Sequence, residues 1–170
     1  MKTFFDKGSP AQYIREAQIV SYLAEKDTMK ENVVDFYGCS KKNKEIKFVM
    51  EYFPTDWDKS YYKSYLLKNS IKFRSSVYKN LTSKTKFMHK QGILHCDLKP
   101  NNIFSLDSLE NFKLGDFGLA KLKWEKEVPY KCDRGSIYYI APEVNKAVID
   151  EKDSGKYDMY SIGMIMAYVE

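Results

Sequence analysis

The first hydrophobic pattern in the chain has the period of an α-helix. Ala17, Val20 and Ala24 recur at helical spacing, and they follow a serine and Pro10, which are residues typical of a helix start. The same spacing places Glu16 one turn before Val20 on the same side. We therefore predict a helix that begins near Pro10 and carries Glu16 on the side of Val20.

Two strands are predicted next, at residues 33–37 and 46–51, from their short runs of apolar and β-branched residues. Residues 41–44 are rich in lysine and lie between the two runs. A solvated hairpin turn explains this lysine cluster better than a binding patch does. Pro54 then ends the strand-like structure.

A second helix is predicted in the middle of the chain. Val77, Leu81, Thr85 and Met88 keep a regular helical spacing, and Gly92 is a suitable residue to end the helix. Short apolar runs separated by polar loops follow over residues 93–113.

A third helix is predicted near the end of the chain. Its apolar stripe has the i, i+3, i+4, i+7 spacing of a helix that buries one face, and it is made by Ile162, Ile165, Met166 and Val169. We find no internal repeat and no low-complexity linker in the sequence.

The composition is that of a globular chain of one domain or less. The 170 residues are 44% hydrophobic, with no run long enough to span a bilayer and no signal peptide at the start. The three cysteines, Cys39, Cys96 and Cys132, are odd in number and lack metal-ligand spacing. We expect reduced thiols and a cytoplasmic or nuclear protein, without a membrane partner.

The net charge of +5 comes from scattered lysines. A nucleic-acid site needs a basic stripe with stacking residues between the charges, and no recognition module has this spacing here. A nucleic-acid-binding protein therefore remains a weak alternative, and we expect no nucleic-acid partner.

The residues with the clearest chemistry lie in one polar loop. Asp97 and Asn102 are five residues apart, and Pro100 prevents a regular helix between them, so that both side chains can project from the loop. Phosphoryl transfer needs a carboxylate near the attacking hydroxyl and oxygen ligands for Mg²⁺. Asp97 suits the first need and Asn102 the second, while Lys99 can offset charge on the transferred group. When this string is taken alone, an ordinary polar turn is the favoured explanation.

Further motifs follow in a fixed order. Asp116 comes nineteen residues after Asp97, directly after a strand-like run and before Phe117 and Gly118. An Ala-Pro-Glu string ending at Glu143 comes next, and then a segment that begins at Asp158. In this order and at these separations the motifs resemble the catalytic half of a eukaryotic protein kinase, of the serine/threonine branch.

The resemblance implies an α+β, two-lobed fold. It implies that residues 1–53 are the remnant of a small β-rich lobe, from the strand lysine to the hinge, and that residues 54–170 are the first part of a mostly helical large lobe. The chain is then expected to be the middle of a kinase domain, because the sequence contains no Gly-rich loop before Lys2 and no large-lobe helices after Glu170. We expect the 170-residue chain alone to be poorly active.

The resemblance also implies roles for individual residues. Asp97 would orient and deprotonate the acceptor hydroxyl with Lys99 beside it, and Asn102 and Asp116 would hold Mg²⁺. Binding of ATP would use a set that includes the strand lysine, its helix partner, the gatekeeper, the hinge and the apolar floor of the adenine site; these are Lys2, Glu16, Met50, Glu51, Phe53 and Phe104.

The resemblance implies scaffolding roles for further residues. His95 is expected to stack on Phe117 in an apolar spine with Val20 and Phe36, and Asp158 to brace the catalytic loop through its backbone. Ser136 stands where a threonine is usual in the segment that seats a protein substrate, and Glu143 would pair with a later arginine.

Position 96 departs from the family pattern, since Cys96 replaces an arginine that binds a phosphate on the activation segment. We expect that phosphorylation of this segment does not switch the protein by that route. The resemblance predicts a protein serine/threonine kinase that uses Mg-ATP, and Lys99 favours serine or threonine over tyrosine. A pseudokinase or non-catalytic interaction module is the alternative.

Overall fold

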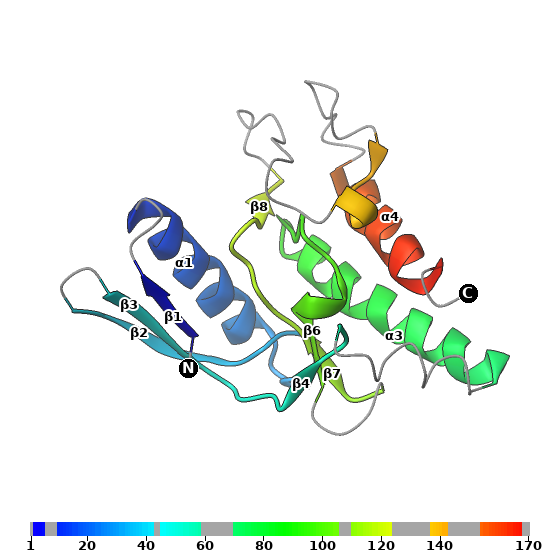
Figure 1. Ribbon diagram of the computed structural model, residues 1–170, viewed down its shortest axis with the longest axis horizontal. Helices are drawn as coiled ribbons and strands as arrows, with labels where there is room; N and C mark the ends of the chain where they lie inside the picture. Colours follow the sequence, from blue (N-terminus) through cyan, green and yellow to red (C-terminus); the bar gives the residue numbers. More distant parts are fainter. Residues whose placement is uncertain are drawn as a thin grey trace.

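The computed structural model describes residues 2–5, 10–42, 45–58, 70–105, 110–123, 137–142 and 154–167. The elements alternate between strands and helices in a mixed α and β arrangement (Figure 1). In chain order they are β1 (Lys2–Phe5), α1 (Pro10–Lys26), β2 (Phe36–Lys42), β3 (Glu45–Met50), β4 (Thr55–Asp56), α3 (Ile71–Lys90), β5 (Ile93–Leu94), η1 (Pro100–Asn102), β6 (Ile103–Ser105), β7 (Phe112–Leu114), β8 (Lys121–Leu122), η2 (Ile137–Tyr139) and α4 (Ser154–Ala167).

Strands β1, β2 and β3 form an antiparallel sheet in the order β1-β3-β2, and α1 lies beside this sheet (Figure 1). Ile46 and Phe48 are buried while Val49 is exposed, which is the period of a half-buried strand. The predicted hairpin is confirmed by the pairing of Lys42 with Glu45. In the described residues, the small β-rich part of the expected fold therefore consists of a three-stranded sheet with one helix beside it.

The predicted start of the first strand of this hairpin was wrong. Residues 33–35 lie outside β2, and Val33 instead forms a parallel bridge with Leu114 of β7. The Val34 amide donates to the Leu114 carbonyl over 2.9 Å, and the Leu114 amide donates to the Asn32 carbonyl over 3.0 Å. Val33 and Val34 are thus paired with a strand that lies eighty residues later, and only Asp35 bonds to the segment after β3, where its carbonyl accepts from the Glu51 amide over 2.9 Å.

The helices agree with their hydrophobic patterns. In α1 the buried side chains include Glu16, Val20 and Leu23, so Glu16 does lie on the apolar side of the helix. Helix α3 is capped by the Ser70 hydroxyl, which accepts a hydrogen bond from the Phe73 amide over 3.3 Å. It buries all four residues of its predicted stripe, and Gly92 follows it with a φ of 75°. The α4 residues Ile162 and Ile165 are fully buried, whereas Val169 lies outside the described residues.

One hydrophobic core joins these elements. It contains side chains from α1, α3 and α4 and from the strands between them, such as Val20, Leu81, Leu114 and Ile165. Helices α3 and α4 lie side by side, and the small strands β4, β6 and β7 lie between them and the sheet (Figure 1). None of the helices in the described ranges is long and apolar enough to cross a membrane.

Candidate active site

The polar loop between β5 and β6 brings three of the predicted site residues into contact. The Lys99 ammonium lies 2.7 Å from Asp97 Oδ2. The Asn102 amide nitrogen donates to the Asp97 backbone carbonyl over 2.7 Å and to Asp97 Oδ2 over 3.0 Å. Asn102 is almost fully buried and sits in the 3₁₀ turn that begins at Pro100. The carboxylate of Asp97 is therefore held in one orientation by an ammonium and an amide.

Asp158 of α4 holds the backbone of the same loop. Its carboxylate accepts hydrogen bonds from the His95 amide over 2.8 Å and the Cys96 amide over 2.9 Å, and His89 Nε2 donates to it over 2.8 Å. Burial raises the pKa of the Asp158 carboxyl, but the hydrogen bonds from His89 and the backbone outweigh burial, so the pKa lies below its usual value. The loop includes Cys96 at a φ of 64°, a conformation that the two backbone bonds at residues 95 and 96 help to fix. The predicted bracing role of Asp158 agrees with these contacts.

Asp116 lies next to this loop because β7 pairs with β6. It has a φ of 62°, in the left-handed region, directly after Gly115. The Gly115 amide donates to the Asn102 carbonyl over 3.1 Å, which places the two predicted metal ligands on hydrogen-bonded segments. A Cβ at Gly118 would lie 3.4 Å from Glu16 Oε2 and 3.6 Å from Asp116 Oδ1, so these two carboxylates flank the same glycine.

The predicted contact between His95 and Phe117 is present. Their ring centroids are 5.2 Å apart, both side chains are buried, and Phe117 belongs to the same core as Val20. His95 Nε2 donates to the Gly115 carbonyl over 3.0 Å, which fits a packed structural histidine rather than a catalytic base.

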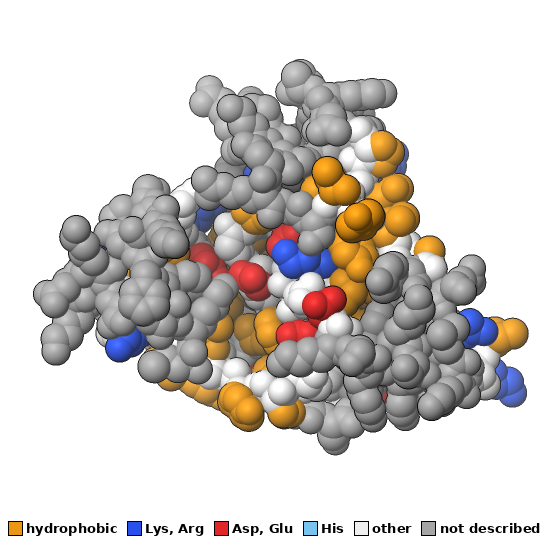
Figure 2. Space-filling model, viewed as in Figure 1, with side chains coloured by type: hydrophobic (Ala, Val, Ile, Leu, Met, Phe, Trp, Pro, Cys, Tyr) orange, Lys and Arg blue, Asp and Glu red, His pale blue; other side chains and the backbone are white. Residues whose placement is uncertain are grey.

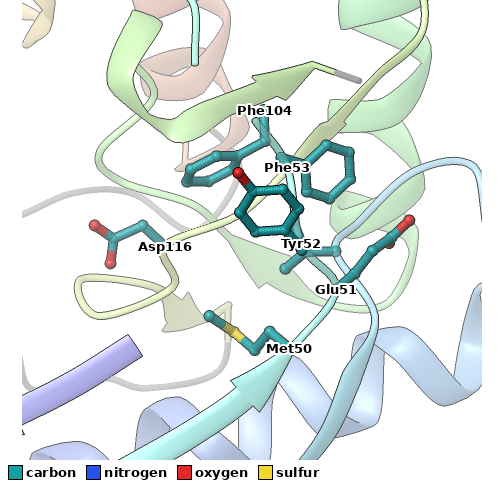
Figure 3. Close-up of a pocket in the computed structure, with 7 residues that line it drawn as sticks. Met50, Glu51, Tyr52, Phe53, Phe104 and Asp116 are labelled. Atoms are coloured by element: carbon teal, nitrogen blue, oxygen red, sulfur yellow. The ribbon is translucent and has the colours of Figure 1, made fainter. Parts of the chain in front are cut away.

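A pocket of about 330 Å³ lies between β3, the segment that follows it, β6 and Asp116. This volume falls in the usual range for a small-molecule site. Figure 3 shows the rings of Phe53, Phe104 and Tyr52 grouped together, with Met50 and Asp116 on the other side of the pocket. The pocket is lined by Val34, Met50, Glu51, Tyr52, Phe53, Phe104 and Asp116.

The surface around this pocket is charged as well as hollowed. Figure 2 shows acidic side chains and lysine or arginine side chains near the middle of one face, between the sheet side and the α3 side of the molecule. In the part of the chain that the structure describes, no three His, Cys, Asp or Glu side chains form a metal-binding group.

Comparison with known proteins decides the family. The model of the protein kinase domain family matches residues 2–169. The chain belongs to the protein kinase family.

The kinase relatives are larger proteins. A "Mitogen-activated protein kinase kinase kinase mkh1" of Cytospora mali is 34% identical over 144 residues, which are 79% of this chain and 7% of that protein. "Calcium-dependent protein kinase 33" of Arabidopsis thaliana is 31% identical over 173 residues, which are 97% of this chain and 30% of that protein. The chain thus spans less than a third of the length of either relative.

The fold of this kinase domain also matches a solved kinase. A chain in the crystal structure of the yeast RNA Pol II CTD kinase CTDK-1 complex superposes with a TM-score of 0.73 at 22% identity, covering 99% of this chain and 53% of that one. The predicted two-lobed, mixed α and β fold is confirmed.

The structure brings together most of the residues that the sequence singled out. Asp97, Lys99 and Asn102 form one cluster. The pocket collects another group, namely Met50, Glu51, Phe53, Phe104 and Asp116. Glu16 lies beside Gly118, but the side chain of Lys2 is outside the described residues, as are Ser136 and Glu143. The roles assigned to all these residues stay predictions, and so does the suggested effect of Cys96.

Sequence reasoning missed an ion pair behind the pocket of this kinase domain. Lys113 of β7 lies 2.6 Å from Glu51 Oε2, and the same oxygen accepts a 3.2 Å hydrogen bond from the Asp35 amide. The Glu51 amide in turn donates to the Asp35 carbonyl over 2.9 Å. The Glu51 side chain therefore joins the segment that follows β3 to Lys113 of β7 and to the Asp35 amide. No signal in the sequence distinguishes Lys113 from the many surface lysines.

Proposed function

We propose that this kinase domain transfers the γ-phosphoryl group of ATP to serine or threonine hydroxyls of a protein substrate. The observation that carries the proposal is the cluster of Asp97, Lys99 and Asn102, joined to Asp116 through the hydrogen bond between the Gly115 amide and the Asn102 carbonyl. The cluster supplies a carboxylate for the acceptor, a cation for the transferred group and oxygen ligands for a metal, which are the groups that phosphoryl transfer needs.

Asp97 is the residue that would receive the acceptor. Its Oδ2 atom is held by Lys99 and Asn102, so the carboxylate is oriented before a substrate arrives. A positioned carboxylate can accept the proton of an attacking hydroxyl, and preorganisation of this kind costs no reorganisation during the reaction. Lys99, which is only partly exposed, offers a nearby positive charge for the phosphoryl oxygens.

The residues present fit Mg²⁺. Asn102 uses its amide nitrogen on Asp97, which leaves the amide oxygen for a cation, and Asp116 supplies a carboxylate on the adjoining segment. Oxygen ligands of this kind are those that Mg²⁺ prefers. When bound, the ion would neutralise charge on the phosphate groups of ATP. The base of ATP would lie in the pocket between Met50, Phe53 and Phe104.

The preference for serine and threonine rests on Lys99 and on the relatives. Lys99 contacts the Asp97 carboxylate directly, so it stands at the place where the acceptor hydroxyl would approach. Among the proteins that this chain is similar to is a Caenorhabditis elegans protein named "Raf homolog serine/threonine-protein kinase", 37% identical over 94 residues.

The test separates nucleotide binding from transfer. We would titrate the 170-residue chain with ATP, with and without Mg²⁺. Transfer of labelled γ-phosphate to a mixture of serine, threonine and tyrosine peptides would be followed at high chain concentration over long times, because the chain alone is expected to be poorly active. We expect Asp116→Asn to abolish the Mg²⁺-dependent part of ATP binding. Asp97→Asn should leave Mg-ATP binding within about threefold of wild type and lower transfer by a factor on the order of 100 or more.

Asp58→Asn is the matched control, because Asp58 is an exposed aspartate outside the site. It should change neither quantity. A wild-type chain that binds no Mg-ATP contradicts the proposal, and so does transfer that survives Asp97→Asn at the wild-type rate. Label found only on tyrosine peptides would contradict the serine/threonine assignment alone.

A further inference from the structure

Gly115 lies between the pocket that contains Phe104 and the cluster of Asp97, Lys99 and Asn102. Its amide donates to the Asn102 carbonyl over 3.1 Å, and its carbonyl accepts a 3.0 Å hydrogen bond from His95 Nε2. The residue is buried and directly precedes Asp116. Both backbone polar groups of Gly115 are therefore fixed, one of them by a residue predicted to bind Mg²⁺.

A side chain at Gly115 would collide with the floor of the pocket. An ideal Cβ would lie 2.8 Å from Phe104 Cε2, 3.1 Å from Phe104 Cδ2 and 3.0 Å from Val34 Cγ1. The backbone angle of Gly115 does not require glycine, since its φ lies outside the left-handed region. Glycine is needed at this position because the Phe104 ring, together with the Val34 side chain, occupies the space of a Cβ.

The Phe104 ring lies between the pocket and Phe53. It lies on β6, its centroid is 6.1 Å from that of Phe53, and it lines the pocket together with Val34. Close-packed side chains transmit a displacement rather than absorb it. A ring pushed by residue 115 must therefore enter the pocket or press on Phe53.

We propose that Gly115 and Phe104 are a pair of positioning residues that couple binding of the nucleotide base to binding of Mg²⁺ at Asp116 and Asn102. The inference rests on the proposed function. A base packed against Phe104 restrains the ring, the ring restrains Gly115, and Gly115 sets the place of Asp116 relative to Asn102. The coupling works in both directions, since the effect of the metal on nucleotide affinity equals the effect of the nucleotide on metal affinity.

The experiment is a double-mutant cycle read as nucleotide affinity with Mg²⁺ and with a chelator. The coupling is the dissociation constant for ATP with chelator divided by the dissociation constant for ATP with Mg²⁺. We would measure this ratio in wild type, Gly115→Ala, Phe104→Leu and the double variant. Gly115→Ala should weaken Mg-ATP binding roughly tenfold, a change that corresponds to about 1.4 kcal/mol and lies within the usual cost of overpacking. It should also lower the ratio, because Asp116 and Asn102 are displaced from each other.

Phe104→Leu removes the ring atom at 2.8 Å, which is the closest of the three contacts, and leaves Val34 Cγ1 at 3.0 Å, so it should relieve the largest part of the collision. We expect the double variant to bind Mg-ATP within about threefold of Phe104→Leu alone, with the ratio restored. Gly163→Ala is the matched control, since a Cβ at Gly163 meets nothing within 4 Å, and it should leave both dissociation constants unchanged. If Gly115→Ala does not fold, folding of the double variant supports the pair.

Three results would overturn the proposal. The first is a double variant that fails to fold, or whose loss of Mg-ATP affinity equals the product of the fold-losses of the two single variants. The second is a Gly115→Ala variant whose affinity falls equally with and without Mg²⁺, which would indicate a merely structural residue. The third is an affinity that does not change. A wild-type chain without Mg-ATP binding would instead remove the proposed function on which the pair rests.

Discussion

The polar loop of residues 95–102 and the pocket between β3 and β6 lie next to each other, but different forces shape them. The loop takes its form from buried hydrogen bonds to charged groups, above all those of Asp158 to the backbone of His95 and Cys96. The pocket takes its form from the volumes of side chains such as Met50 and Phe104, with one ion pair behind it between Glu51 and Lys113. Several hydrogen bonds in the loop share one carboxylate as their acceptor, so all of them are lost when that carboxylate is removed. Packed side chains can instead adjust to a substitution by small movements.

This difference predicts how each region fails. Removing one acceptor from the loop leaves several buried donors without partners at once, and each such donor is costly. Changing one side chain in the pocket alters the fit by a methyl group or two, and neighbouring side chains relax in part. We therefore expect single substitutions in the loop to cause large losses of stability or transfer, and single substitutions in the pocket to cause small losses of nucleotide affinity.

The largest effect is expected for Asp158→Ala. It removes the acceptor for the His95 and Cys96 amides and for His89 Nε2, all of which lie in or beside the buried core. We expect a loss of about 3–5 kcal/mol in the free energy of unfolding, measured by urea denaturation. Asp58→Ala, at an exposed aspartate, should change this free energy by less than about 0.5 kcal/mol. A loss of similar size in both variants would show that the loop does not depend on Asp158.

Acid should weaken both regions through two carboxyls with lowered pKa values. Burial raises the pKa of Asp27, but hydrogen bonds from the Asn32 side chain and from the Asn32 and Val33 amides outweigh it, and Asp158 is affected in the same sense. The unfolded chain therefore binds more protons than the folded chain as the pH falls below the usual pKa of 3.8. The stabilisation is complete above that pH and is lost as the pH falls through the lower pKa values of the folded state.

The measurement is the free energy of unfolding between pH 7 and pH 2. The wild-type curve should be flat with respect to these two groups above about pH 5 and should fall below it. Asp158→Asn should remove the part of the fall in unfolding free energy that comes from the carboxyl in the loop. Asp27→Asn should remove the part that comes from the segment leading to Val34 of the pocket. If each variant keeps the full acid slope of the wild type, the two carboxyls are not its cause.

The two regions also differ in how far the sequence predicts them. The loop could be assigned because its chemistry lies in one short string, with Asp97, Lys99 and Asn102 within six residues. The fourth partner, Asp158, was predicted from its motif rather than from any local pattern. The helices were predicted well, since the apolar stripes of α1 and α3 repeat at the helical period.

What the sequence did not predict depends on contacts between distant segments. Val33 was assigned to the wrong strand pairing, because a run of β-formers does not reveal that Leu114 is its partner. Lys84 of α3 is buried, donates a hydrogen bond to the Glu31 carbonyl and lies over the Phe112 ring, although a lysine in a helix usually indicates a surface position. The close approach of Phe104 to Gly115 likewise joins two segments that no periodicity relates.

The smallest effect is expected for Met50→Leu in the pocket. Met50 is partly buried and lines the pocket, and leucine has nearly the same volume, so neighbouring side chains can adjust at a cost of less than about 1.5 kcal/mol. We expect the dissociation constant for Mg-ATP to change by less than about threefold and the free energy of unfolding to change little. Asp97→Asn is an equally conservative change in the loop, yet it is expected to lower transfer by a factor on the order of 100 or more. If Met50→Leu proved as damaging to binding as Asp116→Asn, the pocket would be as intolerant as the loop, and packing alone would not account for its form.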